Sequence, residues 1–154
     1  MERIDELGKC NTIKNDMVDV LKTHRVLFDN ISSSKSIRGI SPILDSSYPK
    51  FFTSMAQIKT PVSLIITEPI LEIIKKDYSK ELRAFLSLEN ARLYTIKEAR
   101  IAFIVTDAFM TFSLYKRNGE FDFTTSLISF EPSAIKWGED LFEYYQKMAV
   151  EVKQ

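Results

Sequence analysis

The sequence VSLIITEPILEII, at residues 62–74, carries a strand signal followed directly by a helix signal. Its first part, Val62–Ile66, is an apolar run of strand length, which is typical of a strand covered on both faces. Thr67, Glu68 and Pro69 follow as a cap residue and a first-turn proline, and they predict that a helix begins there. Because a strand covered on both faces is characteristic of parallel sheets, this stretch predicts a parallel partner strand.

The segment before this stretch predicts a helix, a short strand and a second helix. Between Asp16 and Ile31, apolar residues recur at steps of three and four, as on one face of an amphipathic helix. Ile37–Leu44 is a β-like run that ends in turn residues, and Tyr48–Ile58 predicts a helix with a proline in its first turn. The apolar stripe of the first helix consists of Met17, Val20, Leu21, His24, Leu27, Phe28 and Ile31.

The segment after residue 74 changes from helical to β-rich spacing. The helical face resumes at Leu82, with a break predicted at Tyr78-Ser79, and Asn118-Gly119 is a strong hairpin signal. After Leu127–Phe130, Glu131-Pro132-Ser133 opens a terminal helix. Because only a few residues separate the other β-rich runs, we expect them to be antiparallel neighbours. These runs are Ala91–Ile96, Ile101–Thr106, Phe109–Tyr115 and Glu120–Thr125.

The summed pattern predicts one domain of the α/β class. We expect a mixed sheet with an early parallel β-α-β-α portion, a later antiparallel meander and a C-terminal helix. A chain of 154 residues is the usual size of a single domain. The only segment that predicts a linker is residues 1–15, which leaves 16–154 as the domain.

The composition excludes several classes of function. Basic and acidic residues both total 21, so no basic excess is available for phosphate neutralisation and DNA binding by this chain alone is not expected. One histidine and one cysteine cannot build a zinc site of the Cys/His type. The four glycines stand too far apart for a phosphate-binding loop. We therefore predict no metal and no cofactor.

The distribution of charge along the chain bears on its location. No stretch without a charged residue exceeds eight positions, whereas a membrane span needs about twenty apolar residues. The N-terminus, MERIDELGKC, is acidic where a signal peptide has basic residues. We predict a cytoplasmic protein without a membrane-spanning segment.

Candidate ligand-binding residues lie near the ends of the predicted strands. Ligands of open α/β sheets collect outside the carboxyl ends of the strands, beside helix N-termini. The alternative is that Asp45 and Thr67 only cap helices and that Asp107 only closes a turn. His24 lies within the inward stripe of its helix, so a core histidine is favoured over a catalytic base, and no catalytic residue is assigned. The candidates are Ser41, Asp45, Thr67, Glu68, Arg100 and Asp107.

Five stretches carry a resemblance to a known family. They are RGISP at 38–42, YPKFF at 48–52, VSLIITEPILE at 62–72, FIVTDAFMTFSLY at 103–115 and LISFEPSAIKWGEDLFEYYQK at 127–147. Together they resemble the effector domain of the methanogenesis regulatory protein family, archaeal winged-helix transcription regulators.

The resemblance implies a regulatory domain that senses a small-molecule effector, pairs as a homodimer, or both. DNA would be read by an N-terminal winged helix-turn-helix domain, and residues 1–15 would be the remnant of the linker to it. An excised domain and a naturally short relative both remain open.

A weaker resemblance is to the half-barrel of phospholipase-D-like enzymes. Their signature is histidine, any residue, lysine, four residues and aspartate; Asp107 matches the aspartate, but Arg100 and Ala102 replace the histidine and lysine. Guanidinium cannot replace an imidazole nucleophile, because it stays protonated. If the old crevice survives as a binding pocket, Arg100 would offer it positive charge. The alternatives to a non-catalytic regulatory domain are thus a residual phosphohydrolase and a pure protein-interaction module.

Overall fold

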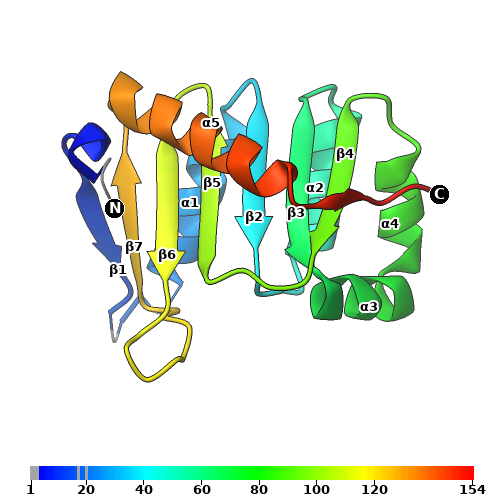
Figure 1. Ribbon diagram of the computed structural model, residues 1–154, viewed down its shortest axis with the longest axis horizontal. Helices are drawn as coiled ribbons and strands as arrows, with labels where there is room; N and C mark the ends of the chain where they lie inside the picture. The colour runs from blue at the N-terminus through cyan, green and yellow to red at the C-terminus, as the bar shows by residue number, and fades with distance from the viewer. Residues whose placement is uncertain (1–3, 17, 20) are drawn as a thin grey trace.

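The computed structural model describes residues 4–16, 18–19 and 21–154. Its strands form one mixed sheet across the long axis of the molecule (Figure 1). The strands are β1 (Asn11–Lys14), β2 (Ile37–Ser41), β3 (Val62–Thr67), β4 (Ala91–Ile96), β5 (Ile101–Thr106), β6 (Met110–Leu114), β7 (Thr125–Ser129) and β8 (Val150–Glu151). Within the described residues, their order across the sheet is β1-β7-β6-β5-β2-β3-β4-β8.

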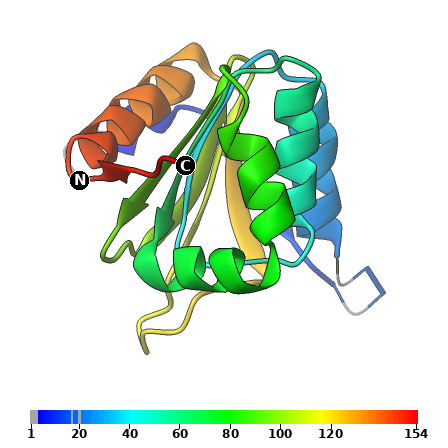
Figure 2. The ribbon, with the colours of Figure 1, turned by 90° about the vertical axis from the view of Figure 1, so that its right-hand side faces the viewer.

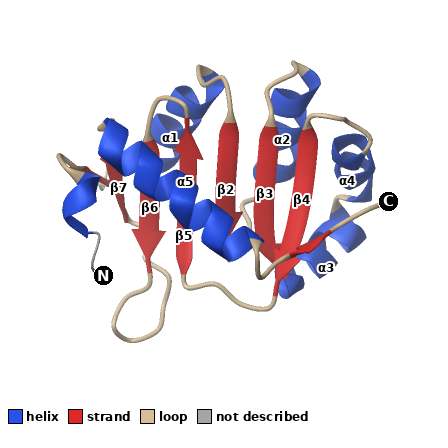
Figure 3. Cartoon of the chain, turned by 45° about the horizontal axis from the view of Figure 1, so that its top comes forward, coloured by secondary structure: helices blue, strands red, loops and turns tan. Residues whose placement is uncertain are grey.

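Helices cover both faces of this sheet. The helices are η1 (Ile4–Leu7), α1 (Lys22–Ser32), α2 (Tyr48–Gln57), α3 (Glu68–Asp77), α4 (Ser79–Leu86) and α5 (Pro132–Gln146). The side view in Figure 2 places α5 on one face and α1 to α4 on the other. Figure 3 shows that α5 runs obliquely across several strands. None of the described helices is long and apolar enough to cross a membrane.

The mixed α/β architecture confirms the predicted fold class. β3 pairs in parallel with both β2 and β4, whereas β5, β6, β7 and β1 form consecutive antiparallel pairs. The junction is β2, which is parallel to β3 and antiparallel to β5. The predicted break at Tyr78-Ser79 is also confirmed, since α3 ends at Asp77 and α4 begins at Ser79.

The prediction that Ala91–Ile96 is an antiparallel neighbour of Ile101–Thr106 is wrong. β4 lies beside β3 in parallel, because α3 and α4 return the chain to the edge where β3 begins. β5 then joins the far side of β2. The connection from Ile96 to Ile101 is five steps long and reaches about 17 Å when extended, enough to pass three strand spacings of about 4.8 Å each.

Two predicted element boundaries also differ from the structure. The first helix begins at Lys22, because the Asp16 side chain accepts hydrogen bonds from the amides of Val18 and Asp19 in a turn before it. Met17 and Val20, predicted in its stripe, lie outside the described residues. The run 120–125 is largely a loop, with an isolated bridge between Tyr115 and Phe121, and β7 starts only at Thr125.

The segment predicted as a linker, residues 1–15, packs against the sheet in its described part. β1 pairs with β7 at the edge of the sheet. The Ser129 hydroxyl donates hydrogen bonds of 2.9 Å to the carbonyl oxygens of Leu7 and Lys9. Leu7 is buried beneath α5 together with other apolar residues. Residues 7–14 are therefore part of the folded unit.

Successive side chains on the central strands serve two separate cores. Phe103 and Val105 belong to the core under α5, whereas Ile104 packs with the core under α1 to α4. Likewise, Val62 and Ile66 face α1 to α4, and Ile65 faces α5. This alternation follows from the period of two in a strand, and it confirms that β3 is covered on both faces.

Candidate ligand-binding cavity

A cavity of about 360 Å³ lies between the sheet and α1 to α4. This volume falls within the range of small-molecule sites in proteins. The cavity reaches the edge where β2 ends, because Ser41 and Asp45 line it. Most of its wall is aliphatic or aromatic. The apolar lining includes Leu27, Phe52, Leu64, Ile66, Ile70, Ile74, Leu82, Phe85, Ile104 and Ile128.

The sheet side of the cavity is built from short side chains. Gly39, Ala102, Thr111, Ser113 and Ser126 line it from four neighbouring strands. The registers of the β2-β5, β5-β6 and β6-β7 pairs bring these residues to the same face of the sheet. Longer side chains at Ala102, Ser113 and Ser126 would extend into the cavity, whereas a Cβ at Gly39 would clash with Ile104 Cδ1.

Two of these side chains form a hydroxyl pair. Ser113 Oγ and Ser126 Oγ lie 2.6 Å apart, whereas the Thr111 hydroxyl donates to the carbonyl oxygen of Leu127 at 2.7 Å. Since one serine donates to the other, the accepting serine keeps its own proton. That proton is not committed in any hydrogen bond among the described residues.

A polar cluster lies at the edge of the cavity, between the start of α1 and the start of α2. His24, Asp45 and Tyr48 line the cavity, and Ser47 lies among them. The His24 ring stacks on the Tyr48 ring, with 5.9 Å between centroids and 5° between planes. His24 Nε2 is 3.4 Å from Ser47 Oγ, and His24 Nδ1 is 4.0 Å from Asp45 Oδ2. The His24 side chain is partly exposed at this edge.

Ser47, His24 and Asp45 are not hydrogen-bonded in the order of a catalytic triad. The Ser47 hydroxyl donates to Asp45 Oδ1, and the Ser47 amide donates to the same oxygen at 2.8 Å. A catalytic serine would instead give its proton to the histidine. In the described geometry, Ser47 holds the Asp45 carboxylate.

The electrostatics of the cluster keep Asp45 charged and Tyr48 neutral. Burial alone would raise the pKa of Asp45, but the two hydrogen bonds from Ser47 and the proximity of His24 hold that pKa below its ordinary value of 3.8. Burial, with the negative charge of Asp45, raises the pKa of Tyr48 to about 12. Asp45 is therefore an anion at neutral pH, and Tyr48 keeps its proton.

Apart from His24, the charged side chains in the described lining of the cavity are carboxylates. Its carboxylates are Asp45, Glu81 and Asp122, and no lysine or arginine is found among its described lining residues. Asp122 is engaged by Thr124, whose amide and hydroxyl donate to it at 2.9 and 2.6 Å. No group of three or more histidine, cysteine, aspartate or glutamate residues in the described part of the chain is arranged to hold a metal ion.

The structure brings only part of the predicted site together. Of the candidates, Ser41 and Asp45 line the cavity. Thr67 is buried at the N-cap position of α3, although its side chain makes no capping hydrogen bond, and Glu68 is exposed in the first turn. Arg100 is exposed just before β5, at the same edge of the sheet but outside the cavity.

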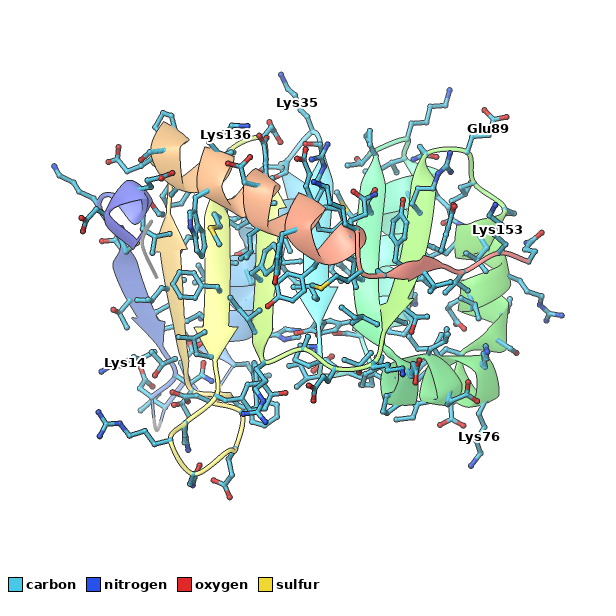
Figure 4. All side chains as sticks on the ribbon, viewed as in Figure 1. Lys14, Lys35, Lys76, Glu89, Lys136 and Lys153 are labelled. Atoms are coloured by element: carbon cyan, nitrogen blue, oxygen red, sulfur yellow. The ribbon has the colours of Figure 1, made fainter. Side chains whose placement is uncertain are left out.

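Asp107 lies at the opposite edge, so the six predicted residues do not share one crevice. Asp107 Oδ1 accepts hydrogen bonds from the amides of Lys35 and Ser36 at 2.7 and 3.3 Å. Figure 4 shows Lys35 at that edge and Lys76 at the other. The reason is that β5 runs antiparallel to β2, so their carboxyl ends point apart. The positions compared with the phospholipase-D signature, Arg100 and Asp107, are therefore separated by the whole of β5.

Sequence reasoning missed the hydroxyl pair and Tyr48. Alternation along β6 and β7 carries a signal for the pair, because Ser113 and Ser126 both sit two positions from an inward residue. The signal needs the register, which pairs Phe112 with Leu127 and so sets Ser113 opposite Ser126. The sequence predicts Tyr48 only as the start of a helix. Its position beside His24 depends on how α1 packs against α2.

Comparison with known structures shows the fold. TrmBL2, described as an archaeal chromatin protein with a novel mode of DNA binding, has a TM-score of 0.74 at 9% identity, over 94% of this chain and 55% of that one. The phospholipase D family member Nuc from Salmonella typhimurium has a TM-score of 0.61 at 13% identity, over 95% and 99%. NucT from Helicobacter pylori has 0.68 at 12%, over 94% and 99%. The phospholipase-D-like likeness of the fold is thus confirmed.

Comparison of sequences is more specific. The methanogenesis regulatory protein FilR1 of Methanothrix harundinacea (strain 6Ac) is 32% identical over 161 aligned positions, which cover all of this chain and 36% of the relative. The chain thus spans about a third of that protein. The profile of the FilR1 middle domain matches residues 20–148. By both matches, the chain belongs to the family described as the middle domain of methanogenesis regulatory protein FilR1.

Proposed function

We propose that this chain is the effector-sensing domain of a cytoplasmic transcription regulator and that it pairs as a homodimer without catalysing a reaction. DNA would be read by a winged-helix domain that lies N-terminal to this folded unit in the full regulator. The observation that carries the proposal is the cavity, because a concave, mostly apolar space of this size with a few polar groups is the usual form of a small-molecule site.

The walls of the cavity suggest how occupancy would reach a preceding domain. Ile13 and Asn15, from β1 and the residue after it, line the cavity together with Thr23 and Leu27 of α1. Asn15 Oδ1 accepts hydrogen bonds from the Thr23 amide and hydroxyl at 2.8 and 2.7 Å. Its Nδ2 donates to the carbonyl oxygen of Phe123 at 3.1 Å. A ligand that favours one position of β1 and α1 would shift the population of domain orientations.

Three observations favour a non-catalytic domain. Arg100 takes the place of the phospholipase-D histidine and lies outside the cavity. His24 does line it, but the Ser47 proton nearby is donated to Asp45. The chain also belongs to a family named for a regulatory protein, which favours a non-catalytic role.

Native mass spectrometry of the purified chain tests this function. We expect a dimer that carries extra non-protein mass. Ala102→Phe, which fills the cavity from its sheet side, should lose that mass, whereas Ala108→Phe, in an exposed turn, should keep it. A bare dimer would favour the protein-interaction module, and a bare monomer would contradict both pairing and sensing.

An activity assay tests the catalytic alternative. The chain is expected to leave bis-p-nitrophenyl phosphate intact at the buffer rate. Hydrolysis that His24→Ala abolishes would overturn the non-catalytic proposal and establish a residual phosphohydrolase. A circular dichroism spectrum that matches that of the parent chain shows that His24→Ala still folds.

A further inference from the structure

We infer that the cavity selects a small amphipathic molecule whose body is apolar and whose polar end is neutral or positively charged, and that it rejects anions. This inference rests on the proposed function and adds the chemical class of the ligand. It is carried by three features of the lining: its apolar walls, the sign of its charges and its uncommitted hydroxyl groups.

The apolar walls define the body of the ligand. Leu64, Ile66 and Ile104 from the sheet line the cavity together with Leu82 and Phe85 of α4. Burying hydrocarbon against such walls is favourable in proportion to the area removed from water, whereas a sugar or nucleotide would leave its polar groups unpaired there. The body is therefore aliphatic or aromatic.

The charges define what the polar end cannot be. Asp45, Glu81 and Asp122 are the carboxylates of the described lining, which contains no lysine or arginine. The His24 ring already faces a carboxylate, since Asp45 Oδ2 lies 4.0 Å from His24 Nδ1. An anionic head would thus meet carboxylates without a lysine or arginine to pair with, which is unfavourable in a partly buried site.

The hydroxyl groups define what the polar end can be. The Ser113 and Ser126 pair keeps one free proton, and the Tyr48 hydroxyl makes no hydrogen bond to any described residue. Both groups can donate to an uncharged oxygen or nitrogen, such as that of an alcohol or amide. The Asp45 carboxylate, held by Ser47, can in turn face an ammonium group.

This geometry also separates the cavity from the phosphodiester chemistry of the enzymes that share the fold. A phosphodiester carries a negative charge and needs cationic partners. Arg100, the cation expected beside the crevice, is exposed and lies outside the lining. The face under α1 to α4 therefore takes a different class of ligand.

Displacement of the fluorescent probe N-phenyl-1-naphthylamine by three ten-carbon amphiphiles tests the inference. The competitors are 1-decanol, decyltrimethylammonium and decanoate, used below their micellar concentrations with the whole chain at neutral pH. We expect the alcohol and the ammonium to bind about tenfold more tightly than the carboxylate. Decanoate binding as tightly as the other two would overturn the inference.

Two variants assign the binding to the cavity and to its charge. Ala102→Phe should abolish displacement by all three amphiphiles, whereas Ala108→Phe should leave it unchanged. Asp45→Asn should weaken decyltrimethylammonium about two- to fivefold and leave 1-decanol unchanged, because the carboxylate is partly exposed. Equal loss of both in Asp45→Asn, with an intact circular dichroism spectrum, would refute the role given to its charge.

The outcomes also separate this inference from the proposed function. Retained mass in the native spectrum together with preference for the anion would leave sensing intact and overturn the ligand class. Absence of retained mass and of any displacement would overturn both. Retained mass identified as an acidic compound would likewise contradict the inference.

Discussion

The two faces of the sheet use the same strands and pack in opposite ways. On the α5 face, Phe103, Val105 and Met110 are buried under the helix, and Gly138 of α5 lies so near that an added Cβ would stand 3.0 Å from Val105. On the other face, the neighbouring positions Ala102 and Thr111 border a cavity of about 360 Å³. The face under α5 is a packed core, whereas the face under α1 to α4 contains a cavity.

The cavity results from the size of the side chains at alternate positions of the strands. Along β2, β5 and β6, large side chains that face α5 alternate with mostly small ones that line the cavity, and Ile104 is the large exception on the cavity side. The large set is Ile40, Phe103, Val105, Met110 and Phe112, and the small set is Gly39, Ser41, Ala102, Thr111 and Ser113. Protein interiors are otherwise close-packed, so we attribute the cavity to the small side chains on these strands.

Removing a phenylalanine from each face should give the largest contrast. Phe142→Ala, in the closed core, is expected to lower the free energy of unfolding by about 3–5 kcal/mol. Phe52→Ala should cost clearly less, because the Phe52 side chain already borders a cavity and loses fewer packed neighbours. Urea denaturation of both variants measures the difference. Equal losses would mean that the two faces pack alike.

Adding a side chain should give the next largest contrast. Gly138→Val is expected to lower the free energy of unfolding by about 1–3 kcal/mol, since its first carbon would already crowd Val105 and Met110. Ala102→Val, placed into the cavity, should change the free energy of unfolding by less than about 1 kcal/mol. A marked loss of thermal stability in Ala102→Val would contradict an open space at that position.

Substitutions of Asp107 and Asp45, which lie at opposite edges of the sheet, should have different effects on stability and on ligand binding. Asp107→Ala removes the acceptor of the Lys35 and Ser36 amides and should cost about 1 kcal/mol without changing displacement of the naphthylamine probe. Asp45→Asn should alter the displacement by the ammonium amphiphile instead. Altered probe binding in Asp107→Ala would show that the two edges are coupled.

The smallest expected effect is on acid stability. The folded-state pKa of Asp45 lies below its ordinary value of 3.8, so its contribution is present above that value and is lost as pH falls through the folded-state pKa. Unfolding free energies measured between about pH 5 and pH 3 should therefore fall less steeply in Asp45→Asn than in the parent chain. An unchanged slope would remove Asp45 from the acid-sensitive groups.

Local patterns predicted most elements but not their order. The two-sided strand Val62–Ile66, the helix that begins with Glu68 and Pro69, and the break at Tyr78-Ser79 all follow from spacing and caps. The position of Ala91–Ile96 beside β3 does not, because its run fits either a parallel or an antiparallel neighbour. Only the crossover through α3 and α4 selects between them.

The candidate site divides in the same manner. Ser41 and Asp45 follow a strand that runs into a turn, and the structure sets both at the cavity. Asp107 carries the same local signal, yet the reversed direction of β5 takes it to the opposite edge. A rule based on carboxyl ends of strands works only where the strands are parallel.

The amino-acid sequence predicts the mixed α/β class and the positions of most helices and strands, and it contains the alternation of large and small residues along β6. These depend on neighbours one to four positions apart, so they are written in the chain locally. The tertiary structure alone decides strand order, the register that sets Ser113 opposite Ser126, and the cavity between sheet and helices. These depend on which distant apolar faces bury one another, and no short stretch contains that information.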